Sequence, residues 1–130
     1  MREEHCTFDY AVIRLVPRVE REEFFNVGVI LSCPRQKFLD VRIRLDEGKL
    51  KCFAPDLEPE AARHYLDVIS KICAGSPEAG VIGRLAPRER FYWLTAQRST
   101  IIQTSPVHTG FCGDAAARRM LEHLFDKMVR

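Results

Sequence analysis

Residues 38–45, Phe-Leu-Asp-Val-Arg-Ile-Arg-Leu, show the plainest structural pattern in this chain, because apolar and charged side chains alternate along them. Successive side chains of a β-strand point to opposite faces, so a period of two is typical of a strand with one buried and one wet face. The buried face would hold Leu39, Val41, Ile43 and Leu45, and the wet face would hold Asp40, Arg42 and Arg44. We therefore expect a strand with one face buried and the other face in solvent.

Two more apolar strands are expected upstream. Residues 6–16, CTFDYAVIRLV, are rich in aromatic and β-branched residues and end at Pro17, and residues 24–32, FFNVGVILS, are almost entirely apolar. Residues 34–37 have the composition of a turn. Because the connections are short, the three strands are expected to form an antiparallel meander.

The second half of the chain is mostly helical in pattern. Helices are expected from Asp56–Pro59 to Gly75, over 87–96, and after an Asp114 cap, while 99–104 returns to strand-type residues. Residues 47–53 fit either a helix or a fourth strand. The sequence thus predicts an α+β fold: a three-strand antiparallel meander plus a C-terminal strand, with helices mainly on one face of the sheet.

Composition limits the class of protein. The 130 residues suit a single domain over 1–130, with a net charge of only +2. The absence of an apolar run of membrane-spanning length and of a signal-peptide pattern leads us to expect a cytoplasmic protein with no membrane contact. Five cysteines, at positions 6, 33, 52, 73 and 112, contain no Cys-x-x-Cys pair, so we expect small core residues, no metal and no cofactor.

Familiar catalytic motifs do not occur. The sequence has no glycine-rich phosphate loop, no Gly-x-Ser-x-Gly and no His-Glu-x-x-His. The pattern therefore favours a protein that is not an enzyme.

Two polar positions in apolar strands stand out. Arg14 lies within Ala-Val-Ile-Arg-Leu-Val, and its guanidinium must reach solvent or a carboxylate. Asn26 and Gly28 are expected on one face of the second strand, where glycine permits close approach of another chain or of a ligand. The structural alternatives are a partly wet strand face for Arg14 and a bulge for Asn26 and Gly28.

Residues 98–110, RSTIIQTSPVHTG, concentrate hydroxyls, an amide, an imidazole and a guanidinium. Pro106 is expected to end the strand and to leave His108-Thr109-Gly110 on a loop, a common place for binding residues, although a capped polar loop would have the same composition. The candidate binding residues are Arg14, Asn26, Arg98, Ser99, Thr100, Gln103, Ser105, His108 and Thr109.

Two other function classes are open. His108 could serve a hydrolase or transferase with Ser105 or Cys112 as nucleophile. The arginines of residues 84–98 surround Phe-Tyr-Trp and could bind nucleic acid, although the same residues suit a helix with a buried aromatic face and a charged wet face.

Three stretches carry a family resemblance: EFFNVGV at 23–29, RST at 98–100 and SPVHTG at 105–110. Across nearly its whole length the chain resembles an uncharacterised bacterial family, domain of unknown function three thousand and thirty-seven. The resemblance implies a small accessory protein without an assigned activity, with a kinase of the HipA type as partner. We therefore expect an accessory protein that binds a partner or a small ligand through a polar patch. A free sheet edge or an exposed strip on the last helix could also support a homodimer.

Overall fold

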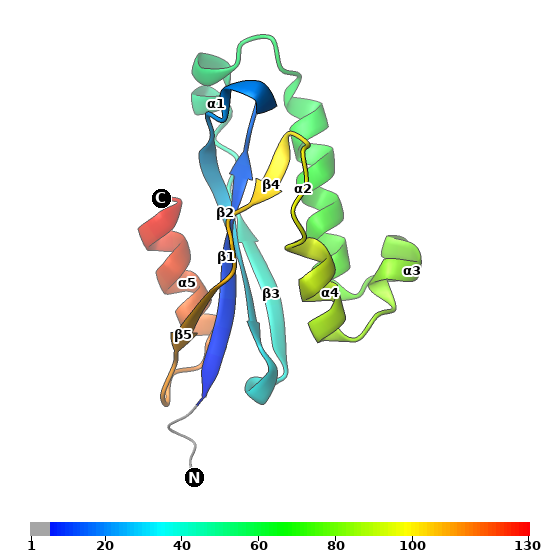
Figure 1. Cartoon of the computed structure of the whole chain (residues 1–130), viewed down its shortest axis with the longest axis vertical. Coiled ribbons are helices and arrows are strands. Elements are labelled where there is room, and N and C mark those ends of the chain that lie inside the picture. Colours follow the sequence, from blue (N-terminus) through cyan, green and yellow to red (C-terminus); the bar gives the residue numbers. More distant parts are fainter. Residues whose placement is uncertain (1–5) are drawn as a thin grey trace.

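The centre of the fold is a long strand, β1 (Thr7–Leu15), with partners on both edges (Figure 1). A computed structural model describes residues 6–130. On one edge, β2 (Phe25–Cys33) pairs with β1, and β3 (Phe38–Ile43) pairs with β2, all antiparallel. The predicted meander is confirmed.

The other edge of β1 carries two short strands. Residues Ile13–Leu15 pair with β4 (Ile102–Thr104), and residues Thr7–Tyr10 pair with β5 (His108–Phe111), both antiparallel. The predicted C-terminal strand is therefore present, but the prediction of a loop at 108–110 is wrong. Pro106 interrupts the pairing, yet β1 is long enough to offer a second segment of free edge, and the chain continues along it.

Helices cover both faces of the sheet. On one face lie α1 (Glu47–Phe53), α2 (Pro59–Ala74) and α4 (Pro87–Leu94), with the short α3 (Gly80–Gly83) beside them; α5 (Ala117–Met128) lies alone on the other face (Figure 1). The α+β prediction with helices mainly on one face is confirmed. The core has one layer on each side: Ile13, Leu15, Ile30, Leu66 and Phe91 on the larger side, and Phe8, Val29, Leu31, Leu121 and Leu124 under α5.

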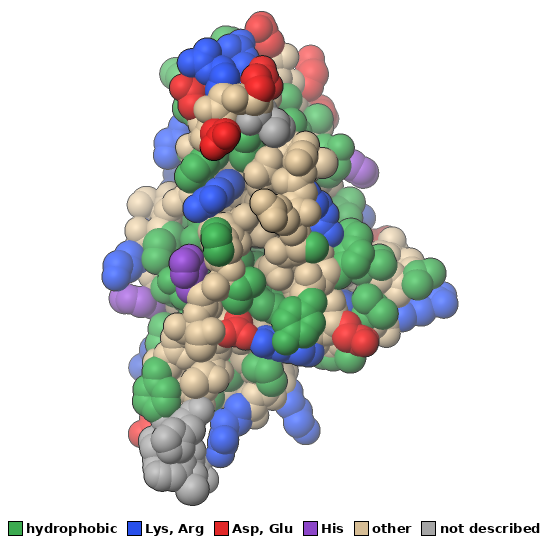
Figure 2. Space-filling model, viewed as in Figure 1, with side chains coloured by type: hydrophobic (Ala, Val, Ile, Leu, Met, Phe, Trp, Pro, Cys, Tyr) green, Lys and Arg blue, Asp and Glu red, His purple; other side chains and the backbone are tan. Residues whose placement is uncertain are grey.

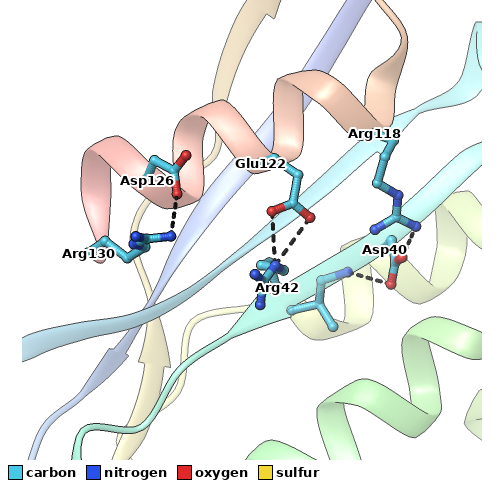
Figure 3. A network of polar contacts seen from close by, with 7 residues as sticks. Asp40, Arg42, Arg118, Glu122, Asp126 and Arg130 are labelled. Carbon is cyan, nitrogen blue, oxygen red and sulfur yellow. Dashed lines mark hydrogen bonds and ion pairs between the residues drawn. The ribbon is translucent and has the colours of Figure 1, made fainter.

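The charged face of β3 is partly open to solvent, as predicted, with Arg44 exposed, but α5 covers part of it. Figure 3 shows α5 lying across it: Arg42 Nε donates to both carboxylate oxygens of Glu122 at 3.0 and 3.1 Å, and Arg118 pairs with Asp40. The apolar stripe of α5 needs the apolar surface of β1 and β2, which brings its charged flank over β3. Alternation alone does not distinguish a solvated face from one that forms ion pairs with a helix.

A β-bulge separates the two polar positions of β2. Ile13 pairs with Gly28 while Arg14 pairs with Asn26, so Val27 is an extra residue. Asn26 therefore faces α5 and Gly28 faces the opposite side, and the prediction that they share a face is wrong. A Cβ at Gly28 would lie 2.8 Å from the Arg42 carbonyl oxygen, so this tightly bent position requires glycine.

A side-chain cap explains where α1 begins, but not where α5 begins. Residues 47–53 are helical because the Asp46 side chain accepts a hydrogen bond from Lys49 N at 3.0 Å. The last helix begins after Ala116 without a side-chain cap, so Asp114 does not have the predicted role.

Only part of the apolar surface of α2 is buried. Ala62, Leu66, Ile72 and Cys73 are buried, whereas Tyr65 and Val68 are 46% and 36% exposed. The helix has more apolar surface than the sheet covers. The uncovered part borders the site described next.

Within the described residues 6–130, we found no helix with both the length and the apolar character needed to cross a membrane.

Candidate functional site

Four of the nine candidate residues line one polar hollow of about 370 Å³: Arg14, Arg98, Ser99 and Gln103. It lies where β1, β4 and the segment before β2 meet. Its remaining lining residues, which the sequence did not single out, are Val16, Glu22, Phe24 and Gln97. Glu22 has a left-handed backbone (φ 56°), which no local motif predicts.

Arg14 is placed by its strand and is not held by partners. It lies between Gln103 on β4 and Asn26 on β2, and its guanidinium stacks on the Phe24 ring at 4.2 Å. Its Nε is buried and has no hydrogen-bond partner within the described residues. A buried donor without an acceptor is costly. The terminal guanidinium nitrogens of Arg14 are not buried and have no hydrogen-bond or ion-pair partner among the described residues, so they are available to a group that enters the hollow.

Arg98 has a structural role at the same place. Its guanidinium donates to the carbonyl oxygens of Leu94, Ala96 and Trp93 at 3.2, 3.1 and 2.6 Å, and it stacks on the Trp93 ring at 4.4 Å. These bonds satisfy carbonyls at the end of α4. Arg98 therefore shapes the wall of the hollow, whereas Arg14 has binding capacity left.

The 99–104 segment folds back on itself. Thr100 Oγ1 donates to the Ile102 carbonyl at 2.8 Å, and Gln103 Nε2 donates to the Thr100 carbonyl at 2.9 Å. The side-chain oxygen of Gln103 and the exposed Ser99 hydroxyl remain as polar groups beside Arg14.

An apolar groove of about 320 Å³ adjoins the hollow and shares Arg98 and Gln103 with it. Its apolar lining comes from α2, α4 and β4 and consists of Tyr65, Val68, Ile69, Ile72, Trp93, Leu94 and Ile102. Trp93 is 40% exposed. Figure 2 shows hydrophobic side chains at the surface over α2 and α4, beside a band of uncharged polar and backbone atoms. Together, groove and hollow form one site with an apolar and a polar end.

A larger open depression of about 730 Å³ lies between β3 and α2. Its central cation, Arg63, is already paired with Glu47 and Glu60. Asp67 in the same depression pairs with Lys71. Its charged groups are thus paired within the fold, and we place the candidate site in the hollow and groove.

Two other candidate residues are tied into the fold elsewhere. Asn26 Nδ2 donates to the Met128 carbonyl at 2.9 Å and so holds the end of α5. Ser105 is buried; its hydroxyl accepts from Val12 N and donates to the Pro106 carbonyl, both at 2.9 Å. Neither reaches the hollow's lining, so the nine residues do not form one patch.

Thr109 belongs to a charged network that the sequence did not predict. Its hydroxyl donates to Asp9 at 2.6 Å, and Arg88 binds Asp9 and also donates to Ser32 Oγ at 2.8 Å. Burial raises the pKa of Asp9, but the hydrogen bonds from Arg88 and Thr109 outweigh burial and hold that pKa below its ordinary value. The network joins α4 to β1, β2 and β5.

His108 is exposed on β5, with its ring 5.4 Å from the Tyr10 ring. The nucleophiles considered for it are engaged elsewhere: Ser105 as above, and Cys112 in a buried thiol cluster where burial raises its pKa to about 12. No hydrogen bond joins His108 to either residue within the described chain.

The arginines of residues 84–98 are largely occupied by the fold. Arg88 pairs with Asp9, Arg90 donates to the Leu85 and Cys73 carbonyls, and Arg98 donates to the end of α4. This leaves little free positive charge for phosphates.

Comparison with known proteins gives one match. A family model described as "Protein of unknown function (DUF3037)" matches residues 10–129. No curated protein and no solved structure matches the chain.

Proposed function

The chain belongs to the DUF3037 family, and we propose that it is an accessory binding protein that holds a short segment of a partner polypeptide across the hollow and groove. An apolar side chain of the partner occupies the groove, and a carboxylate or carbonyl oxygen next to it accepts hydrogen bonds from Arg14. The chain itself performs no chemistry in this account.

The observation that carries the proposal is Arg14. Its guanidinium is fixed against Phe24 beside a hollow, and its Nε lacks an acceptor. Arginine binds carboxylates through two parallel hydrogen bonds, and such bonds are stronger when water is partly excluded. A carboxylate in the hollow would accept hydrogen bonds from the terminal nitrogens of Arg14, which have no partner among the described residues.

The groove supports a polypeptide as the occupant. Trp, Tyr and Arg are the residues that most often dominate binding energy in protein interfaces, and Trp93, Tyr65 and Arg98 all line this groove. Uncharged polar groups at its edge, from Thr100, Gln103 and Thr104, are suited to the peptide groups of a partner.

We further propose that the protein acts in the bacterial cytoplasm. A kinase of the HipA type, suggested by the family resemblance, is the first partner to examine. Self-association into a homodimer is the competing use of the exposed apolar surface, and size-exclusion chromatography with light scattering on the purified protein would detect it.

The test is affinity purification from the native cell with quantitative mass spectrometry. Wild-type chain is compared with Arg14→Gln and with a control, Arg119→Gln, an exposed arginine on α5 away from the hollow. We expect one enriched protein with the wild type and the control, reduced at least tenfold with Arg14→Gln. Equal recovery with all three baits, or no specific protein with the wild type, would overturn the proposal.

A further inference from the structure

Three cysteines that lie far apart in the sequence converge in the core under the N-terminal end of α5. Cys6 and Cys112 are neighbours at the β1–β5 edge, and Cys33 ends β2. The three sulfur atoms lie within 4.8 Å of one another, with Cys6 Sγ 3.6 Å from Cys33 Sγ and 2.6 Å from Cys112 Sγ. The side chains are buried, with residue exposures of 4%, 0% and 6%.

A polar side chain closes the cluster on its outer side. Gln36 Nε2 lies 3.5 Å from Cys6 Sγ and 3.8 Å from Cys112 Sγ, while Gln36 Oε1 accepts from Ala117 N at 2.6 Å. Amide N–H groups directed at sulfur stabilise thiolates around bound metals, and the positive end of α5 has the same effect. Gln36 is itself exposed and marks a route from solvent.

We propose that Cys6, Cys33 and Cys112 form a binding site for one thiophilic divalent cation, with Zn²⁺ as the occupant. Zinc binds thiolate sulfur at about 2.3 Å in a tetrahedron, which separates the sulfur atoms by about 3.8 Å. The Cys6–Cys33 distance already matches this value, and Cys112 needs to move about 1 Å away from Cys6. The fourth position is left for water.

The balance of charge and protons is simple. Zn²⁺ displaces the protons of the three thiols to solvent, and no electron is transferred. The competing chemistry is a Cys6–Cys112 disulfide, which would leave Cys33 alone and remove the site.

The test begins with wild-type full chain, reduced and freed of metal with a chelator. It is titrated with Zn²⁺ against a chromophoric zinc indicator. We expect one Zn²⁺ per chain with a dissociation constant below about 1 µM. Zinc should also slow the alkylation of Cys6, Cys33 and Cys112 by N-ethylmaleimide relative to the metal-free chain, and leave the rates at exposed Cys52 and buried Cys73 unchanged. Binding weaker than about 1 µM, or alkylation rates of Cys6, Cys33 and Cys112 that zinc leaves unchanged, would overturn the proposal.

Matched variants locate the site. Cys112→Ser should weaken zinc binding at least 100-fold, whereas Cys52→Ser and Cys73→Ala, which remove thiols outside the cluster, should bind zinc as the wild type does. Where Cys112→Ser fails to fold, the alkylation pattern of the wild type alone decides. A Cys6–Cys112 disulfide in protein trapped with alkylating agent at lysis would contradict the zinc site.

Discussion

Replacing Arg14 with methionine should stabilise the protein, which is unusual for a change at a half-buried strand position. The buried Nε without an acceptor costs about 1–3 kcal/mol in the native state. The substitution also removes the stacking on Phe24, worth about 0.5–1 kcal/mol at this partly exposed ring. Taking about 2 kcal/mol for the first effect, the net gain is about 1 kcal/mol.

Arg98→Met is the matched control, because Arg98 borders the same hollow but is fully engaged. It loses three hydrogen bonds to main-chain carbonyls and the stacking on Trp93. Because Arg98 is partly exposed, we expect these lost interactions to lower the free energy of unfolding by about 2 kcal/mol. The two substitutions should therefore shift stability in opposite directions.

Urea and thermal unfolding followed by circular dichroism measure both variants. For a chain of this size, about 1 kcal/mol corresponds to roughly 4 °C in Tm, so Arg14→Met should melt higher by about 4 °C and Arg98→Met lower by about 8 °C. A loss of 1 kcal/mol or more in Arg14→Met would refute the reasoning. Arg14 would then be a structural residue, with no capacity left for a ligand.

Three further substitutions test other parts of the structure. Asp9→Asn should lower the free energy of unfolding by about 2 kcal/mol, because it leaves Arg88 without its carboxylate. Because folding lowers the pKa of Asp9, this difference in stability from wild type should be constant above about pH 5 and shrink as the pH falls below about 4. Urea unfolding at a series of pH values measures it. Gly110→Ala should lose about 1–3 kcal/mol, since its Cβ would overlap the buried Phe8 ring, and an unchanged melting curve would contradict this packing. Tyr65→Ser, at a side chain that is 46% exposed, should leave the Tm within about 2 °C of wild type while weakening partner capture, and capture at wild-type level would remove the groove from the site.

The strands were predictable because their signals are local. Alternation over 38–45 and the apolar runs at 6–16 and 24–32 are properties of neighbouring residues, and the short turns between them leave few ways to pair. The element that covers the second face of a strand is set by residues far away in the sequence. The alternation predicts that Asp40 and Arg42 are solvated, yet both pair with side chains of α5, about eighty residues later in the chain.

The candidate site was partly predictable for the same reason. An arginine in an apolar strand is conspicuous in any sequence, and Arg14 does line a hollow with Ser99 and Gln103. Asn26 was conspicuous too, and the structure has the bulge that was the structural alternative there: it lies at Val27 and turns Asn26 to the other face. A glycine in a strand allows a bulge but does not distinguish it from a binding position.

The cysteines show what spacing alone leaves out. Metal motifs are recognised by short intervals, but here antiparallel pairing along both edges of β1 brings Cys33 and Cys112 to Cys6 from intervals of 27 and 106 residues. Only the register of the sheet reveals that they meet.

The proposed binding depends most on Arg14, the residue that receives the partner. Its most direct test is the dissociation constant of the purified partner for wild type, Arg14→Gln and Arg119→Gln, measured by isothermal titration calorimetry. We predict that Arg14→Gln weakens binding by about 10–100-fold, the effect of one charge-assisted hydrogen-bonded pair, with Arg119→Gln unchanged. Equal dissociation constants for all three proteins would contradict it.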